Sequence, residues 1–91
     1  MQMGQDTAGP QVTMYTTSWC GYCARARQLF RSKGVLVTEI DVEHMPGARD
    51  EMRARSGRNT VPQIFVGELH LGGYDDTRAL DQKGELDKLL A

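Results

Sequence analysis

A strand–helix–strand pattern in the first half of the sequence places the strongest constraint on the fold. Residues Val12–Thr16 are partly β-branched and bounded by turn residues, which is typical of a short strand. From about Cys20 to Lys33, apolar residues recur at steps of three and four with arginines between them, which indicates an amphipathic helix ended by Gly34. A second strand is predicted over Val35–Ile40. Because a helix joins the two strands, we expect them to lie parallel in one sheet.

The second half of the chain supplies two more strands and three helices. In order, the predicted elements are a helix Gly47–Arg55, strands Pro62–Val66 and Leu69–Leu71, and helices Asp75–Gln82 and Glu85–Leu90. The two-residue turn between the strands makes them an antiparallel hairpin. The order βαβ-α-ββ-α predicts one α/β domain over residues 12–91, with a four-stranded mixed sheet flanked by helices. Residues 1–11 are polar, contain two glycines and a proline, and are expected to form a flexible tail.

The two cysteines of the sequence, Cys20 and Cys23, lie where the first strand gives way to the first helix. That is the position of redox-active pairs in thioredoxin-like folds. A structural bridge is a poor explanation, because a disulfide between residues three apart closes too small a loop to stabilise much. A structural zinc site needs about four ligands, and only the isolated His44 and His70 could join the pair. Redox chemistry is therefore the leading interpretation.

The two cysteines are not equivalent in this position. Free backbone N–H groups and the macrodipole at a helix N-terminus favour an anion, and the thiolate is the attacking form of cysteine. Cys20 follows a loop and should be accessible, whereas Cys23 lies one turn further, on the apolar face with Ala26 and Phe30. We therefore expect Cys20 to be the nucleophile and Cys23 the resolving cysteine. Two small core residues are the plain alternative, which suits Cys23 alone better than the pair.

Charge and hydropathy argue against several other classes of function. The net charge is −1, with Lys and Arg spread along the chain, so no basic stripe points to nucleic acid or an anionic membrane. No run approaches the ~18 apolar residues of a membrane span. The N-terminal residues also lack the basic and apolar regions of a signal peptide. The expected location is the cytoplasm.

Two further segments, taken with the cysteine pair, resemble one family. CGYC at 20–23, TVP at 60–62 before a strand, and GGYDD at 72–76 before a helix occur together and in this order. With the run RSGRNTVPQIFV at 55–66, they are similar to the dithiol, bacterial-type glutaredoxins, and the similarity extends from Val12 to the C-terminus. The resemblance implies a thioredoxin-like fold and a glutathione-dependent thiol–disulfide oxidoreductase. Its substrates would be protein–glutathione mixed disulfides and protein disulfides.

The resemblance also implies a glutathione site, made of Tyr22, Arg49, Thr60, Val61, Pro62, Gly73, Tyr74, Asp75 and Asp76. Val61, before a cis-proline, would pair its backbone with the cysteinyl part of glutathione. Tyr22 would flank the sulfur, and Arg49 would reach the glycyl carboxylate. Plain alternatives remain open: Pro62 could simply begin a strand, where its missing N–H does little harm, and Arg49 could be a solvated helix charge.

The turn before the third predicted helix would bind the γ-glutamyl end. Gly72 and Gly73 let a backbone approach closely, and a helix N-terminus suits a carboxylate. In the family, Asp76 would pair with the α-ammonium group and N–H groups near Asp75 would bind the carboxylate. Both aspartates could instead cap the helix. For Asp75 capping is at least as good an interpretation, whereas for Asp76 we favour the ligand.

Two departures from the commonest family pattern raise an alternative function. Thr17 replaces the usual lysine, which removes a cation near the thiolate, and Gly21 replaces the usual proline. Glutaredoxins with glycine there suggest a [2Fe–2S] cluster, bridged between two subunits by two Cys20 thiolates and two glutathiones. The protein would then be a dimeric cluster carrier or redox sensor, and otherwise a monomer. A reductase served by a flavoprotein is a third possibility, against which the TVP and GGYDD segments argue.

Overall fold

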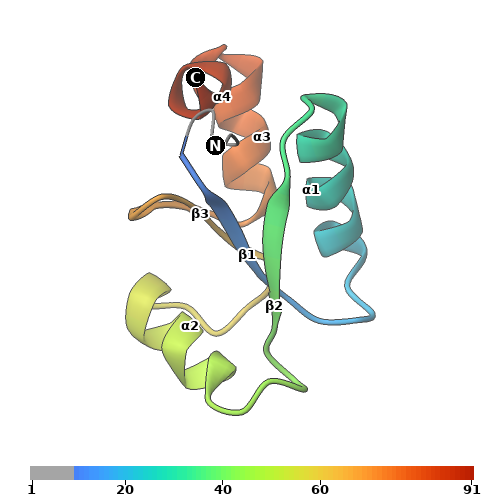
Figure 1. The fold of residues 1–91 in the computed structure, drawn as a ribbon, viewed down its shortest axis with the longest axis vertical. Coiled ribbons are helices and arrows are strands. Elements are labelled where there is room, and N and C mark those ends of the chain that lie inside the picture. The colour runs from blue at the N-terminus through green and yellow to red at the C-terminus, as the bar shows by residue number, and fades with distance from the viewer. Residues whose placement is uncertain (1–9) are drawn as a thin grey trace, which may run out of the picture.

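The predicted strand–helix–strand unit is present in the computed structural model, which describes residues 10–91 (Figure 1). It consists of β1 (Val12–Thr16), α1 (Gly21–Ser32) and β2 (Val37–Asp41). β1 and β2 pair in parallel, as the helical crossover requires. β3 (Gln63–Val66) pairs antiparallel with the other edge of β1, and β4 (Leu69–Gly72) pairs antiparallel with β3. The four-stranded mixed sheet therefore has the order β2-β1-β3-β4, and the thioredoxin-like architecture is confirmed.

The two faces of the sheet carry two separate cores, because successive side chains of a strand point to opposite faces. On one face, Val12, Met14 and Ile64 pack with residues of α1 and of α4 (Glu85–Leu90), beside α3 (Tyr74–Gln82). On the other face, Tyr15 and Phe65 pack against α2 (Ala48–Ser56). Figure 1 shows α1 and α2 on opposite sides of the strands. The larger apolar core thus holds α1 on the sheet through Ala26 and Phe30.

β2 begins two residues later than predicted, for a reason that lies in the end of α1. Gly34 adopts a left-handed φ of 73°, and its N–H bonds to the carbonyl of Arg31. The N–H of Val35 bonds back to the carbonyl of Phe30. These two bonds make a Schellman cap, in which the residue after the glycine also packs on the core. Val35 is therefore committed to closing the helix, and ladder pairing starts at Val37.

The remaining boundaries agree with the sequence to within one residue. α2 begins at Ala48, α3 begins at Tyr74, β3 begins at Gln63, and β4 extends to Gly72. The predicted flexible tail lies, for residues 1–9, outside the described residues. Its last residue, Gln11, accepts a hydrogen bond from the N–H of Gly67 (2.8 Å). Within residues 10–91, no helix is long and apolar enough to span a membrane.

Candidate active site

Cys20 is the N-cap residue of α1, with extended backbone angles (φ −98°, ψ 114°). Its Sγ accepts a hydrogen bond from the N–H of Cys23 at 3.2 Å, so the sulfur takes the place that an oxygen fills in a common N-cap. The first turn of α1 contains no acidic side chain that could compete for the positive helix end. Cys20 is partly exposed and Cys23 is fully buried. The structure therefore places the two thiols as the sequence analysis expects.

Burial separates the chemistry of the second thiol from that of the first. It raises the pKa of Cys23 to about 12, and the contact with the Cys20 sulfur adds to the effect. Cys23 is consequently a protonated thiol at neutral pH. A protonated, enclosed thiol is a weak nucleophile, so the arrangement leaves attack on an incoming disulfide to Cys20.

The loop before β3 brings Val61 to the cysteine from forty residues further along the chain. The Sγ of Cys20 lies 3.7 Å from the Val61 carbonyl oxygen, to which the thiol donates a weak hydrogen bond. The Val61–Pro62 peptide bond is cis. A cleft of about 210 Å³ extends from this point. Its lining residues are Tyr22, Arg58, Thr60, Val61, Pro62, Gln63, Gly73, Tyr74, Asp75 and Asp76.

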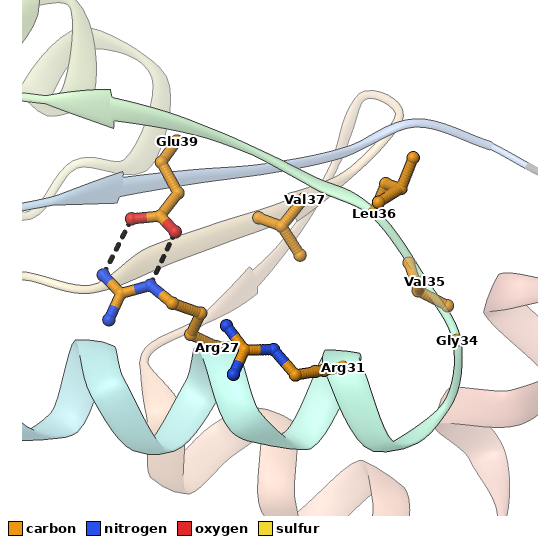
Figure 2. Close-up of a pocket in the computed structure, with 7 residues that line it drawn as sticks. All are labelled: Arg27, Arg31, Gly34, Val35, Leu36, Val37 and Glu39. Atoms are coloured by element: carbon orange, nitrogen blue, oxygen red, sulfur yellow. Dashed lines mark hydrogen bonds and ion pairs between the residues drawn. The ribbon is translucent and has the colours of Figure 1, made fainter.

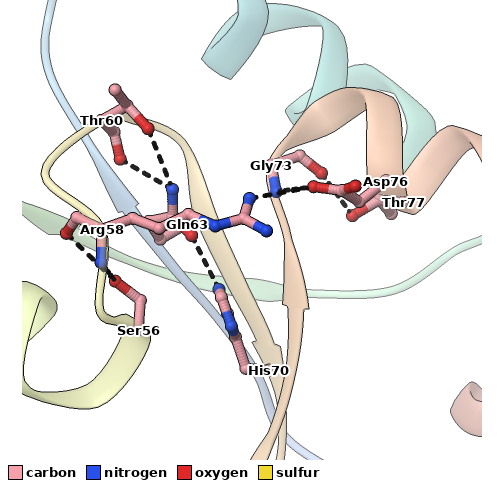
Figure 3. Close-up of polar contacts among 8 residues, drawn as sticks. All are labelled: Ser56, Arg58, Thr60, Gln63, His70, Gly73, Asp76 and Thr77. Atoms are coloured by element: carbon pink, nitrogen blue, oxygen red, sulfur yellow. Dashed lines mark hydrogen bonds and ion pairs between the residues drawn. The ribbon is translucent and has the colours of Figure 1, made fainter.

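The far end of the cleft is the N-terminus of α3, where Asp76 folds back toward the start of its own helix. Its Oδ2 accepts the N–H of Gly73 at 2.9 Å and a hydrogen bond from the Arg58 guanidinium at 3.1 Å (Figure 3). The Gly73 N–H, and secondarily Arg58, hold the pKa of Asp76 below its ordinary value. The carboxylate is thus charged and fixed in orientation while half of it stays exposed.

Gly72 makes this arrangement possible. Its φ of 107° lies in a region that side-chain-bearing residues rarely adopt, and a Cβ there would stand 2.3 Å from Asp76 Oδ2. The backbone can therefore approach the carboxylate closely only with glycine at this position.

The structure brings together every predicted glutathione residue except Arg49. That side chain lies on α2 and donates to Asn59 Oδ1 at 3.2 Å, outside the lining of the cleft. For Asp75 the sequence made capping at least as good an interpretation as ligand contact, and for Asp76 it favoured the ligand. Asp76, and not Asp75, makes the hydrogen bond to the N-cap residue of α3.

Sequence reasoning missed two residues of the cleft, Arg58 and Gln63. Arg58 reaches the cleft only through the fold, since Asp76, with which it pairs, lies 18 residues further along the chain. Its backbone is held by Ser56, whose Oγ accepts the Arg58 N–H at 3.0 Å. Gln63 gave no signal, because a polar residue in a short strand is ordinary until its face of the sheet is known.

A second hollow, of about 340 Å³, lies between α1 and the outer strand β2 (Figure 2). Its charged residues Arg27 and Glu39 form a two-pronged ion pair, with N···O distances of 2.6 and 2.8 Å. Neither cysteine lines this hollow. The contact between Cys20 and Val61 lies beside the smaller cleft, which Val61 lines, and not at this hollow.

Comparison with known proteins agrees with this geometry. The family model described as Glutaredoxin matches residues 12–71. The chain belongs to the glutaredoxin family. It is 50% identical over 82 residues to the glutaredoxin of Pseudomonas aeruginosa, which covers 90% of this chain and 98% of that protein. Family membership identifies the chain as a thiol–disulfide oxidoreductase.

Solved glutaredoxin structures show the same fold. The solution structure of the glutaredoxin from Brucella melitensis superposes with a TM-score of 0.79 at 49% identity and covers 94% of each chain. The crystal structure of a buckwheat glutaredoxin–glutathione complex superposes with a TM-score of 0.82 at 26% identity. It covers 89% of this chain and 76% of the buckwheat chain.

Proposed function

We propose that this glutaredoxin uses glutathione and reduces protein–glutathione mixed disulfides, and protein disulfides by a dithiol route. The observation that carries the proposal is the continuous cleft that leads from the Cys20–Val61 contact to the charged N-terminus of α3. Glutathione has a thiol in its middle and an amino-acid group at its γ-glutamyl end. A cleft that begins at Val61, whose carbonyl contacts the Cys20 sulfur, and ends at a carboxylate beside free helix N–H groups suits both. The glutathione bound in the buckwheat structure adds support.

Each end of the cleft has a role in this proposal. The backbone of Val61 pairs with the cysteinyl residue of glutathione, and Tyr22, which is 54% exposed, forms an apolar wall beside the sulfur. Asp76 pairs with the α-ammonium group. N–H groups at the start of α3 and the guanidinium of Arg58 accommodate the α-carboxylate. Arg49 is left as an outer cation that approaches the glycyl carboxylate once its bond to Asn59 opens.

The reaction is a pair of thiol–disulfide exchanges. The Cys20 thiolate attacks the glutathione sulfur of the mixed disulfide, the old S–S bond breaks, and the substrate leaves as a thiolate that takes a proton from water. A second glutathione thiolate then attacks the Cys20–glutathione disulfide, which releases glutathione disulfide and restores the Cys20 thiolate. With a protein disulfide, Cys20 attacks one substrate sulfur and forms a mixed disulfide, while the other substrate sulfur leaves as a thiol. Cys23 then attacks the Cys20 sulfur, which releases the second substrate thiol and forms a Cys20–Cys23 disulfide that two glutathiones reduce, with release of glutathione disulfide. Because its pKa is raised, Cys23 must lose its proton during its attack on Cys20.

A matched pair of peptide substrates tests the proposal. One peptide carries glutathione on its single cysteine, and the other carries free cysteine in the same disulfide linkage. We expect the glutathionylated peptide to be reduced with a markedly lower KM, because only it has the γ-glutamyl group that reaches Asp76. Equal KM values for the two peptides would contradict glutathione recognition.

The iron–sulfur alternative receives less support. A [2Fe–2S] cluster takes four ligands, and residues 10–91 contain no group of three or more His, Cys, Asp or Glu side chains placed to hold a metal. Cys23 is buried, so one chain could offer only Cys20. A cluster would need a second copy of the chain and two glutathiones. A brown, dimeric product of anaerobic reconstitution that is lost in Cys20→Ser would favour the cluster.

In the absence of a cluster, we propose a monomer working in the cytoplasm, where both thiols stay reduced.

A further inference from the structure

Gln63 is a polar side chain in an enclosed place. It is the first residue of β3, directly after Pro62, and is 1% exposed. It lies on the α2-facing side of the sheet with Phe65, because residues two apart in a strand share a face. A buried amide is costly unless its donors and its oxygen find partners. The partners that Gln63 has are therefore informative.

The Gln63 amide joins two segments of the chain. Its Nε2 donates to the carbonyl oxygen of Thr60 at 3.0 Å and to the Thr60 hydroxyl at 3.2 Å (Figure 3). Its Oε1 lies 2.7 Å from Nε2 of His70 in β4. A carbonyl can only accept, so the amide nitrogen must face Thr60 and the amide oxygen must face His70. The His70 ring therefore donates from Nε2.

His70 is held in place from a different direction. It pairs with Phe65 across β3 and β4, and the two ring centroids are 4.8 Å apart. Burial, with a further contribution from Arg58, lowers the pKa of His70. The ring is therefore neutral at neutral pH, with its proton on Nε2. The neutral His70 ring, packed on Phe65, therefore fixes the position of the Gln63 amide oxygen.

The Gln63 amide connects His70 to the loop that faces Cys20. Thr60 is exposed, yet its carbonyl is fixed by the buried Gln63 amide. The next residue is Val61, whose carbonyl contacts the Cys20 sulfur. We propose that Gln63 and His70 are positioning residues for glutathione, which hold the Thr60–Pro62 segment in the orientation that pairs with the cysteinyl backbone of the ligand. This inference rests on the proposed function.

Two substitutions remove hydrogen bonds of the Gln63 amide at different points. Gln63→Met keeps the volume of the side chain and removes all of its hydrogen bonds, and His70→Phe keeps the ring on Phe65 but removes its donor. At about 0.5–1.5 kcal/mol for each neutral hydrogen bond, we expect KM for the glutathionylated peptide to rise about fivefold in Gln63→Met and about threefold in His70→Phe. In both variants, kcat for the glutathionylated peptide should stay at the wild-type level, because the substitutions act on binding through the Thr60–Pro62 segment.

Three further variants separate positioning from a general loss of stability. His70→Gln restores a donor and should recover the wild-type KM. The double variant Gln63→Met/His70→Phe should be no worse than Gln63→Met, because His70 acts through Gln63. Gln11→Met removes an exposed glutamine–threonine hydrogen bond, to Thr38 at 3.0 Å, away from the cleft, and should leave KM unchanged.

Each contrary result has a distinct meaning. An unchanged KM in folded Gln63→Met and His70→Phe would overturn the inference, as would a fall in kcat without a rise in KM. If Gln63→Met does not fold, His70→Phe and His70→Gln decide the matter alone. If the wild-type protein shows equal KM values for the two peptides, the proposed function itself fails and this inference fails with it.

Discussion

Two helix N-termini meet at the proposed glutathione cleft, and they are built differently. At the start of α1, the cap is the sulfur of Cys20 and the first turn has no acidic residue. At the start of α3, the first turn contains Asp75 and Asp76, and the Asp76 carboxylate already bonds to the Gly73 N–H and to Arg58. The positive end of the α1 dipole thus acts on the Cys20 sulfur, whereas the positive end of α3 is partly neutralised by the Asp76 carboxylate.

The difference shows that a helix N-terminus does not by itself define a ligand. The backbone offers the same free N–H groups in both places, and the first-turn side chains decide what binds there. The glycine near the start of each helix also differs in how closely it is packed. A Cβ on Gly21 would meet nothing within 4 Å, whereas a Cβ on Gly72 would collide with Asp76. The α1 end is therefore open to sequence change, and the α3 end is fixed by close packing.

The largest expected effect comes from the α1 end. Cys20→Ser should abolish reduction of the glutathionylated peptide, because a serine hydroxyl cannot form the mixed disulfide. Cys23→Ser should keep much of that activity, because free glutathione can resolve the Cys20 adduct. Steady-state kinetics with the two variants measure this. Comparable losses in both would mean that the burial difference between the thiols does not assign their roles.

At the α3 end, Gly72→Ala should be the most damaging change. The left-handed φ of 107° and the 2.3 Å approach to Asp76 Oδ2 both oppose a methyl group. We expect the free energy of unfolding to fall by about 1–3 kcal/mol, and KM for the glutathionylated peptide to rise as the carboxylate is displaced. Gly73→Ala is the matched control, since its Cβ would lie at an ordinary 3.5 Å from the Pro62 carbonyl. Equal free energies of unfolding for Gly72→Ala and Gly73→Ala, measured in urea, would contradict this account.

A milder test at the same end is Asp76→Asn. Because the folded-state pKa of Asp76 lies below its ordinary value of 3.8, its carboxylate stabilises the fold above that pH. The stabilisation is lost as the pH falls through the lowered folded pKa. We expect wild type to be more stable than Asp76→Asn by about 0.5–1 kcal/mol at pH 7, allowing for the half-exposed pair with Arg58. The two proteins should converge in strongly acidic buffer.

Kinetics complete the test of Asp76. If its charge pairs with the α-ammonium group of glutathione, KM for the glutathionylated peptide should rise about tenfold in Asp76→Asn, while the cysteinylated peptide is reduced as before. A stability loss without any change in KM would leave Asp76 with its capping role only.

The sequence predicted the parts of this molecule that depend on local pattern. Periodicity located the strands and helices, and the position of Cys20 before an amphipathic helix was enough to distinguish the two thiols. The exceptions depend on contacts made across the chain. Val35 is drawn out of β2 by the Schellman bonds to Phe30, and the side chain of Arg49 turns toward Asn59.

The hydrogen bond between Gln63 and His70 depends on side-chain orientations that the sequence does not give, although strand alternation already places the two residues on one face of the sheet. The pairing of β3 and β4 shifts between Ile64 and Phe65, so that Ile64 lies opposite Gly72 and Phe65 opposite His70. The shift leaves one extra residue, Leu71, in β4, and such a bulge changes which side chains share a face. His70 and Phe65 lie on the turn side of this shift, so the face that they share with Gln63 is unaffected.

The smallest expected effect concerns the start of α1, at Gly21. Gly21 is the first helical residue, where proline loses no hydrogen bond, and Cys20 before it has the extended angles that proline requires. Gly21→Pro should therefore raise the free energy of unfolding by about 0.4–1 kcal/mol, by restricting the unfolded chain, and leave reductase activity unchanged. Urea unfolding measures the gain. Proline at Gly72 should destabilise instead, since it cannot reach a φ of 107°. Destabilisation by both substitutions would show that the start of α1 is as tightly constrained as that of α3.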